Sequence, residues 1–124
     1  MKISDMLEYG RPIIERWPAF HKYTIGEDIM REMLLMLRLA TKARLRYMNK
    51  STLADLDTSN AILDVLLQQA NNVIFTDRKG EKRRLLTDQS YGHWSGLTEE
   101  IGKLIGGWIN SVNDRKNSNK GNVP

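Results

Sequence analysis

IGEDIMREMLLMLRLATKARLRYMNK, residues 25–50, is the longest uninterrupted helical pattern in the chain. It contains no proline, and its only glycine is Gly26. Apolar side chains recur every three or four residues, which predicts a helix with one buried face. The positions of that face are Met30, Met33, Leu37, Ala40, Ala43 and Tyr47, widened by Ile29, Met36 and Leu39. Thr24 and Glu27 have the spacing of a capping box, so we expect the helix to span residues 24–48.

A second side of the same stretch is basic. Its cations follow one another at four-residue steps, and we call them the basic stripe: Arg38, Lys42, Arg46 and Lys50. Each step turns about 40° beyond a full helical turn, so these side chains share one broad side and could meet several phosphates. No acidic residue follows Glu32 in the stretch, Arg31 extends the stripe backward, and Arg44 adds charge on another side. The alternative is a solvated helix face whose last cations complement the helix dipole.

Three further segments have helical periodicity, at residues 3–17, 52–75 and 88–112. Pro12 predicts a kink or a restart in the first of them, and Pro18 predicts its end. No alternating pattern typical of a strand extends beyond four residues. Short connections favour antiparallel neighbours, so the sequence predicts an all-α fold, an antiparallel four-helix bundle over residues 1–113. Residues 114–124 form a basic tail in which Val123 is the only aliphatic side chain, and we expect it to lack order.

Two connections matter for the site. Residues 19–23 precede the long helix, and residues 76–86, TDRKGEKRRLL, contain a turn at Gly80. Five basic residues surround that turn, and we call them the loop cluster: Arg78, Lys79, Lys82, Arg83 and Arg84. In an antiparallel bundle the loop cluster lies at the opposite end from Lys50, so the two groups of cations do not form one patch. Arg31 and Arg38 could link the stripe toward the loop; alternatively, the loop cluster docks a protein partner.

Three glycines, Gly102, Gly106 and Gly107, lie inside the last predicted helix, where each costs about 1 kcal/mol relative to alanine. Close approach of another backbone would offset this cost. The neighbour is either the first helix of the same chain or a second subunit. Trp108, beside these glycines, is expected to be a core or interface residue rather than a ligand platform.

Composition limits the class of protein. The chain has 124 residues, a net charge of +4 and a pI near 9.5, which mildly favours polyanion binding. It has no cysteine, which excludes disulfides and thiolate metal sites. The first residues, MKISDMLEYGRP, lack the apolar run of a signal peptide, and no segment has the apolar length of a membrane span. We therefore expect a soluble, cytoplasmic protein.

No group of residues predicts catalysis or a bound metal. His21 and His93 are isolated, without partners at metal-ligand spacing. The acids that come nearest to a catalytic or Mg²⁺-binding set are Asp55, Asp57, Asp64, Glu99 and Glu100. Acids in the first turns of helices are better explained as partners of the helix dipole. Since phosphate-binding loops and a Ser/His/Asp order are also missing, we expect no enzyme activity and no cofactor.

Three stretches together resemble a known family: FHKYTIGEDI (20–29), STLADLD (51–57) and LTEEIGKLIGGWINSV (97–112). In this order they resemble the four-helix-bundle proteins related to the 23S rRNA intervening-sequence proteins. Within that group, the likeness is to the accessory variability determinant (Avd) proteins of diversity-generating retroelements. The likeness covers roughly residues 3–115, and IGKLIGGWINSV is its most specific part.

The resemblance implies a non-catalytic accessory subunit that forms a homo-oligomeric ring, a pentamer in the Avd case. Such a ring would bind the reverse transcriptase of its retroelement, with the RNA template and the cDNA, and would support mutagenic reverse transcription. The basic stripe, Arg31, Arg44 and the loop cluster would then contact nucleic acid, and the glycines would contact another subunit. Two alternatives stay open: a scaffold that docks proteins without touching nucleic acid, and a stand-alone bundle of the intervening-sequence family.

Overall fold

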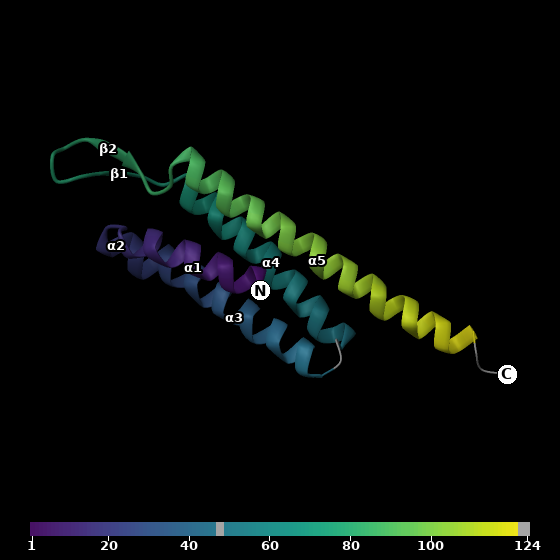
Figure 1. The fold of residues 1–124 in the computed structure, drawn as a ribbon. Helices are drawn as coiled ribbons and strands as arrows, with labels where there is room; N and C mark the ends of the chain where they lie inside the picture. Colours follow the sequence, from purple (N-terminus) through teal and green to yellow (C-terminus); the bar gives the residue numbers. More distant parts are fainter. Residues whose placement is uncertain (47–48, 122–124) are drawn as a thin grey trace.

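The computed structural model describes residues 1–46 and 49–121, and this part of the chain is mostly helical with a small two-stranded sheet (Figure 1). The elements are α1 (Lys2–Glu15), α2 (Ala19–His21), the π-helical turn η1 (Lys22–Gly26), α3 (Glu27–Leu45), α4 (Lys50–Asn71), β1 (Ile74–Thr76), β2 (Lys82–Arg84) and α5 (Asp88–Gly121). The longer helices, α1, α3, α4 and α5, lie alongside one another. The prediction of a mainly helical protein is confirmed, and the small sheet departs from it.

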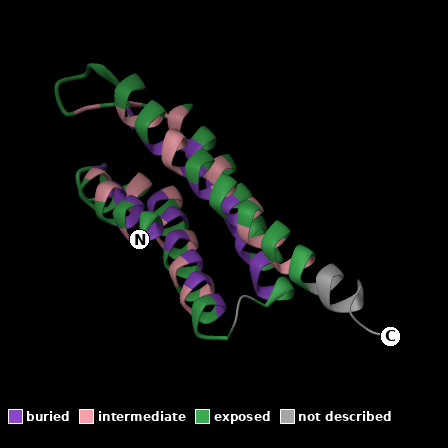
Figure 2. Cartoon of the chain, turned by 45° about the vertical axis from the view of Figure 1, so that its right-hand side comes forward, coloured by how far each residue is buried: buried purple, intermediate pink, exposed green. Residues whose placement is uncertain are grey.

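The hydrophobic core lies between these helices. Helix α3 packs along α4, α4 packs along α5, and α1 contacts both α3 and α5. Buried positions gather on the sides of the helices that face one another (Figure 2). On α3 the predicted face is confirmed: Ile29, Met33, Met36, Ala40 and Ala43 are buried, and Met30, Leu37 and Leu39 are half-buried. Tyr47, which the sequence places on the same face, lies outside the described residues.

Helix α1 continues through Pro12, so the restart that proline predicts does not occur, and the helix ends before Pro18 as expected. Gly10 is buried against the indole of Trp94 on α5. A Cβ at Gly10 would lie 2.7 Å from Cη2 of that ring. Glycine therefore allows a close contact between α1 and α5 at a position where the pattern suggests only an interruption.

The segment before α3 is helical rather than an irregular connection. Helix α2 begins directly after Pro18, and η1 passes into α3 without a break. Thr24 does not cap α3, because its hydroxyl donates a hydrogen bond to the carbonyl oxygen of Phe20 at 2.7 Å, one turn earlier. Helical structure thus starts before the predicted residue 24. Helix α3 ends at Leu45, and residues 47–48 of the predicted helix lie outside the described residues.

Helix α4 begins with Asn49 as its N-cap, whose side chain accepts a hydrogen bond from the Ser51 amide at 2.8 Å. It ends at Asn71, before the predicted end at residue 75. The difference arises because the last predicted residues enter a β-hairpin instead.

Strands β1 and β2 pair antiparallel, with register pairs Ile74–Arg84, Phe75–Arg83 and Thr76–Lys82. The prediction of an irregular loop is wrong here, because three-residue strands are too short for an alternating pattern to appear in the sequence. The predicted turn at Gly80 is confirmed, since this residue has φ +79°, a conformation that glycine adopts without steric cost.

Helix α5 begins after Thr87, whose Oγ1 accepts a hydrogen bond from the Ser90 amide at 3.0 Å. It extends to Gly121, well past residue 112, so most of the tail that was expected to lack order continues the helix. Residues 122–124 of that tail lie outside the described residues. Over the described part of the chain, no helix combines the length and the apolar character that crossing a bilayer requires.

Candidate nucleic-acid interface

Part of the basic stripe surrounds a hollow on the outer side of α3. Arg38 and Lys42 are exposed on the helix, and Arg46 follows as its C-cap with φ −118° and ψ 33°. The hollow has a volume of about 490 Å³ and is lined by Leu37, Arg38, Thr41, Lys42, Leu45 and Arg46. Among the described residues, no carboxylate forms an ion pair with Arg38, Lys42 or Arg46. These cations are therefore available to an external anion.

The stripe is shorter than the sequence suggests. Lys50 does not continue α3, because it is the first residue of α4. At the other end, Arg31 donates hydrogen bonds to Glu27 at 3.0 Å and to Asp28 at 3.2 Å. Both carboxylates lie one turn before Arg31, so its charge is neutralised within the helix and does not extend a positive surface. Arg44 is exposed in the last turn of α3, outside the hollow.

Exposed leucines lie beside the cations of α3. The charge pattern of the sequence does not indicate them. Leu45 is 71% exposed, and Leu34 and Leu35 are 42% and 41% exposed. The signal for Leu45 is present in the sequence, because it lies three residues after Lys42 on the same side of the helix. The outer side of α3 is therefore both basic and apolar.

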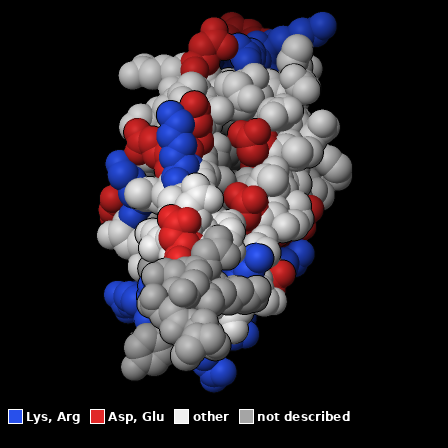
Figure 3. All heavy atoms as spheres, turned by 90° about the vertical axis from the view of Figure 1, so that its right-hand side faces the viewer, with Lys and Arg blue, Asp and Glu red and all other residues white. Residues whose placement is uncertain are grey.

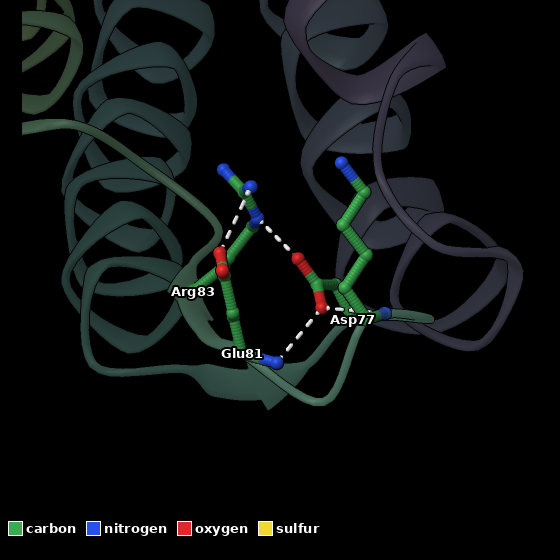
Figure 4. Close-up of polar contacts among 4 residues, drawn as sticks. Asp77, Glu81 and Arg83 are labelled. Carbon is green, nitrogen blue, oxygen red and sulfur yellow. Dashed lines mark hydrogen bonds and ion pairs between the residues drawn. The ribbon is translucent and has the colours of Figure 1, made fainter.

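The loop cluster contains two kinds of cation. Structural cations form ion pairs within the chain, and available cations form none with the described carboxylates. Arg83 donates from Nε to Asp77 Oδ2 at 2.6 Å and lies 3.5 Å from Glu81 (Figure 4). Asp77 also accepts hydrogen bonds from the amides of Glu81 and Lys79, both at 2.9 Å. The bond from Arg83, followed by the Glu81 amide, lowers the pKa of the Asp77 carboxyl below its ordinary value. Arg83 thus fixes the hairpin turn.

Arg84 is also engaged within the chain. It donates to Asp88 Oδ1 at 2.7 Å and to Asn71 Oδ1 at 2.8 Å, which ties β2 to the ends of α4 and α5. Arg78, Lys79 and Lys82 are exposed, and their side chains form no ion pair with the described carboxylates. These three cations of the loop cluster are the ones that no described carboxylate neutralises.

The two sets of available cations lie at opposite ends of the molecule. The hairpin projects at the end where α3 begins, whereas Arg46 lies where α3 ends (Figure 1). As expected from the sequence, they do not form a single patch within one chain. Because the charge of Arg31 is neutralised, it does not bridge the gap between them.

A groove between α4 and α5 is acidic and brings together three of the acids noted in the sequence, Asp57, Asp64 and Glu99. It has a volume of about 370 Å³ and is lined by Asp57, Asn60, Ala61, Asp64, Ser95, Thr98, Glu99 and Gly102. Inside it, Asn60 Nδ2 donates to the Thr98 carbonyl at 2.9 Å, and the Thr98 hydroxyl lies 3.2 Å from Asp64 Oδ1. Acidic and basic side chains are interspersed on the face drawn in Figure 3. Carboxylates of the groove repel phosphates, so the groove itself does not favour nucleic acid.

The glycines of α5 do not contact the first helix of the same chain. A Cβ at Gly106 or Gly107 would meet no atom within 4 Å, so the intrachain explanation for these glycines is wrong. At Gly102 a Cβ would lie 3.3 Å from the Asn60 side chain, which is not a backbone contact. Trp108 is half-buried and packs against the core.

The two histidines lie against aromatic rings. The ring of His21 is 5.9 Å from that of Phe75, and the ring of His93 is 4.4 Å from that of Tyr9. Within residues 1–46 and 49–121, no group of three or more His, Asp or Glu side chains has an arrangement that could hold a metal ion.

Comparison with known proteins identifies the family. None of the curated proteins matches the chain. The family described as bAvd-like matches over residues 1–112, a span that includes every described helix and strand except the last nine residues of α5. The match agrees with the resemblance to Avd proteins carried by residues 20–29, 51–57 and 97–112. Because it covers most of the chain, this protein belongs to the bAvd-like family of Avd-type accessory proteins.

Proposed function

We propose that the protein is a non-catalytic accessory subunit of a diversity-generating retroelement, and that it binds the reverse transcriptase together with RNA template and cDNA. In this proposal its long helices form an antiparallel four-helix bundle, which presents cations on two surfaces. Arg38, Lys42 and Arg46 contact phosphates at one end, and Arg78, Lys79 and Lys82 contact them at the other. Arg44 and Lys50 add charge near the first surface.

One observation carries the nucleic-acid part of the proposal. Arg38, Lys42 and Arg46 surround a single hollow, and none of them is neutralised by a described carboxylate. Ion pairs occupy Arg31, Arg83 and Arg84, so the chain separates structural cations from available ones. Unneutralised cations on one helical side are the arrangement that releases counterions from a nucleic acid.

The second part of the proposal is assembly into a homo-oligomeric ring, a pentamer as in Avd proteins. Open glycines along α5 support it, because a second subunit could approach the helix backbone there. In a ring, the available cations of each chain would repeat around the axis. Separate small positive surfaces would then form a wall long enough to hold an extended nucleic acid.

The nucleic-acid proposal is tested by the salt dependence of RNA binding. Binding of a fluorescent RNA should weaken steeply with salt, because each phosphate contact contributes about 0.7 to 0.9 to the log–log slope. The double variant Arg38→Gln/Lys42→Gln should reduce the slope by about 1.4 to 1.8. The matched control is Lys2→Gln/Lys103→Gln, which removes the same charge from residues paired with Glu100 and Glu99. A flat salt dependence, or equal losses in the two double variants, would contradict the proposal.

A second candidate function is a protein-docking scaffold without direct nucleic-acid contact. The exposure of Leu34, Leu35 and Leu45 beside the cations favours it, because apolar side chains contribute little to phosphate binding. Capture of the reverse transcriptase after nuclease treatment separates the two candidates. If Leu45→Ser abolishes capture while RNA binding by the isolated protein is absent, the scaffold function is the correct one.

A further inference from the structure

The turn between α1 and α3 holds aromatic rings in solvent. Phe20 is 72% exposed and Tyr23 is 66% exposed, whereas Trp17 and Trp94 are buried. Pro18 starts α2 in an extended conformation, with φ −53° and ψ 147°. The helical structure that follows, from α2 through η1, fixes the directions of both exposed rings relative to the core. Neighbouring exposed apolar side chains mark a candidate site for a ligand or partner.

A row of rings begins with the exposed ring of Phe20 and crosses from α2 to the hairpin. The ring of Phe20 meets that of His21 edge-on, at 5.2 Å between centroids. The ring of His21 lies 5.9 Å from that of Phe75 on β1. Tyr23 follows Phe20 by three residues and carries the Lys22 ammonium 5.6 Å from its ring centroid. We call Phe20, His21, Tyr23 and Phe75 the aromatic platform.

Cations without an ion-pair partner lie at the same end of the molecule as the platform. Arg16 shares a hollow of about 260 Å³ with Trp17, Pro18 and Phe75, between the end of α1 and the hairpin. The hairpin that carries Arg78, Lys79 and Lys82 projects at the same end of the molecule as α2 (Figure 1). None of these cations forms an ion pair with the described carboxylates.

Acidic residues lie on both sides of the platform, and those of the hairpin, Asp77 and Glu81, are paired with Arg83. Glu15 and Glu27 lie with Tyr23 around a separate hollow between α1 and the start of α3. Glu27 is paired with Arg31, which leaves Glu15 as the unpaired acid of that hollow among the described residues. On the hairpin side, Arg78, Lys79 and Lys82 have no described carboxylate partner, so the charge there is net positive.

We propose that the aromatic platform binds unpaired bases of single-stranded nucleic acid, while Arg16, Lys22 and the available hairpin cations hold the flanking phosphates. Rings stack on the face of any base, and that face is accessible only where the strand is not paired. The basic stripe meets phosphates of single and double strands alike, so the platform supplies a preference that the stripe lacks. This inference rests on the proposed nucleic-acid function and names the form of nucleic acid bound at the hairpin end. An apolar protein segment is the competing occupant, and the surrounding cations favour the nucleic acid.

The test compares two probes: a fluorescent oligouridine of about 16 nucleotides, and a blunt RNA duplex of about the same length. Phe20→Leu removes the ring but keeps an apolar side chain at an exposed position. It should weaken oligouridine binding about tenfold and leave duplex binding within about twofold. Phe20→Trp keeps a ring and should retain oligouridine binding. Val65→Ala, which shortens an apolar side chain that is 54% exposed on α4, is the matched control and should change neither affinity.

The outcomes distinguish failure of the aromatic platform from failure of the proposed nucleic-acid function. Unchanged oligouridine binding in Phe20→Leu, with the expected loss in Arg38→Gln/Lys42→Gln, would overturn the platform and leave the proposed function intact. Equal losses for both probes in Phe20→Leu would also overturn the preference for unpaired bases. If the unaltered protein binds neither probe, the proposed function and this inference both fail.

Discussion

Gly10 illustrates how much one missing methyl group matters in this protein. Its backbone lies against the ring of Trp94, which is fully buried and surrounded by the core. In Gly10→Ala the new Cβ clashes with the ring, and the ring cannot move into solvent. We expect the substitution to lower the free energy of unfolding by about 1 to 3 kcal/mol, measured by chemical denaturation.

The control for Gly10→Ala is Gly92→Ala on α5. A Cβ at Gly92 would meet no atom within 4 Å, so alanine there is expected to stabilise the isolated chain by about 0.5 to 1 kcal/mol through its helix propensity. Equal effects of the two substitutions would show that the contact between Gly10 and Trp94 does not limit the packing of α1.

A pH effect is expected at Asp77. The hydrogen bond from Arg83 holds the pKa of its carboxyl below the ordinary value, so the folded state binds this proton less readily than the unfolded chain does. The resulting stabilisation is present above the unfolded pKa of about 3.9 and is lost as the pH falls through the lower folded pKa. An NMR titration of the Asp77 carboxyl should show a midpoint below that of an unstructured peptide.

The cause of the shift is tested by Arg83→Gln, which should raise the pKa of Asp77 toward its ordinary value. Arg78→Gln removes a neighbouring cation that makes no hydrogen bond to Asp77 among the described residues, and is the control. An equal rise in both variants would mean that general positive charge, rather than the bond from Arg83, sets this pKa.

The sequence predicts which cations lie together on a helix, but it predicts less well which of them are neutralised by carboxylates. Sequence spacing identifies Arg38, Lys42 and Arg46 as one group, and the structure brings them around one hollow. Arg31 and Arg83 look equivalent to them in the sequence, yet their charges are neutralised by carboxylates. For Arg31 those partners lie three and four residues earlier and could be recognised. For Arg83 the partner is brought near by the hairpin, which the sequence pattern does not reveal.

At the scale of elements, a buried hydrogen bond joins Trp17, two residues after the end of α1, to Leu85, directly after β2. Trp17 Nε1 donates to the carbonyl oxygen of Leu85 at 3.0 Å, and both residues are buried. Trp17→Phe leaves that carbonyl without its partner, which is expected to cost about 1 to 3 kcal/mol. Amide hydrogen exchange in residues 74–84 should accelerate more than exchange in α4. If the hairpin amides keep their protection, another contact anchors the hairpin.

Long-range contacts such as this bond separate the elements that the sequence predicts from those that it does not. Helices α3 and α4 carry a long apolar period, so their existence follows from the sequence, with errors only at their ends. The strands of the hairpin and the α2–η1 turn contain three to five residues each, too few for a period to appear. These short elements are held in place by contacts between residues far apart in the sequence, such as Trp17 with Leu85 and His21 with Phe75. The aromatic platform was missed for this reason.

At the scale of the whole molecule, α5 has glycines beside which the described part of the chain leaves open space. A Cβ at Gly92, Gly96, Gly106 or Gly107 would meet no atom within 4 Å. Each of these glycines costs about 1 kcal/mol relative to alanine in a helix, and no described residue packs closely against the space where a Cβ would lie. A second subunit that approaches the helix closely would supply this packing. The open glycines therefore support the proposed ring.

The ring is tested with Gly106→Leu. Leucine at an open position should leave the fold of the single chain intact but hold a second subunit away, so light scattering should show a lower mass than for the unaltered protein. Gln69→Leu adds the same side chain to an exposed position of α4 and should preserve the assembly. A monomeric unaltered protein at micromolar concentration would contradict the ring itself. An unchanged mass in Gly106→Leu would instead show that subunits meet away from α5, because a contact close enough to require glycine does not accept leucine.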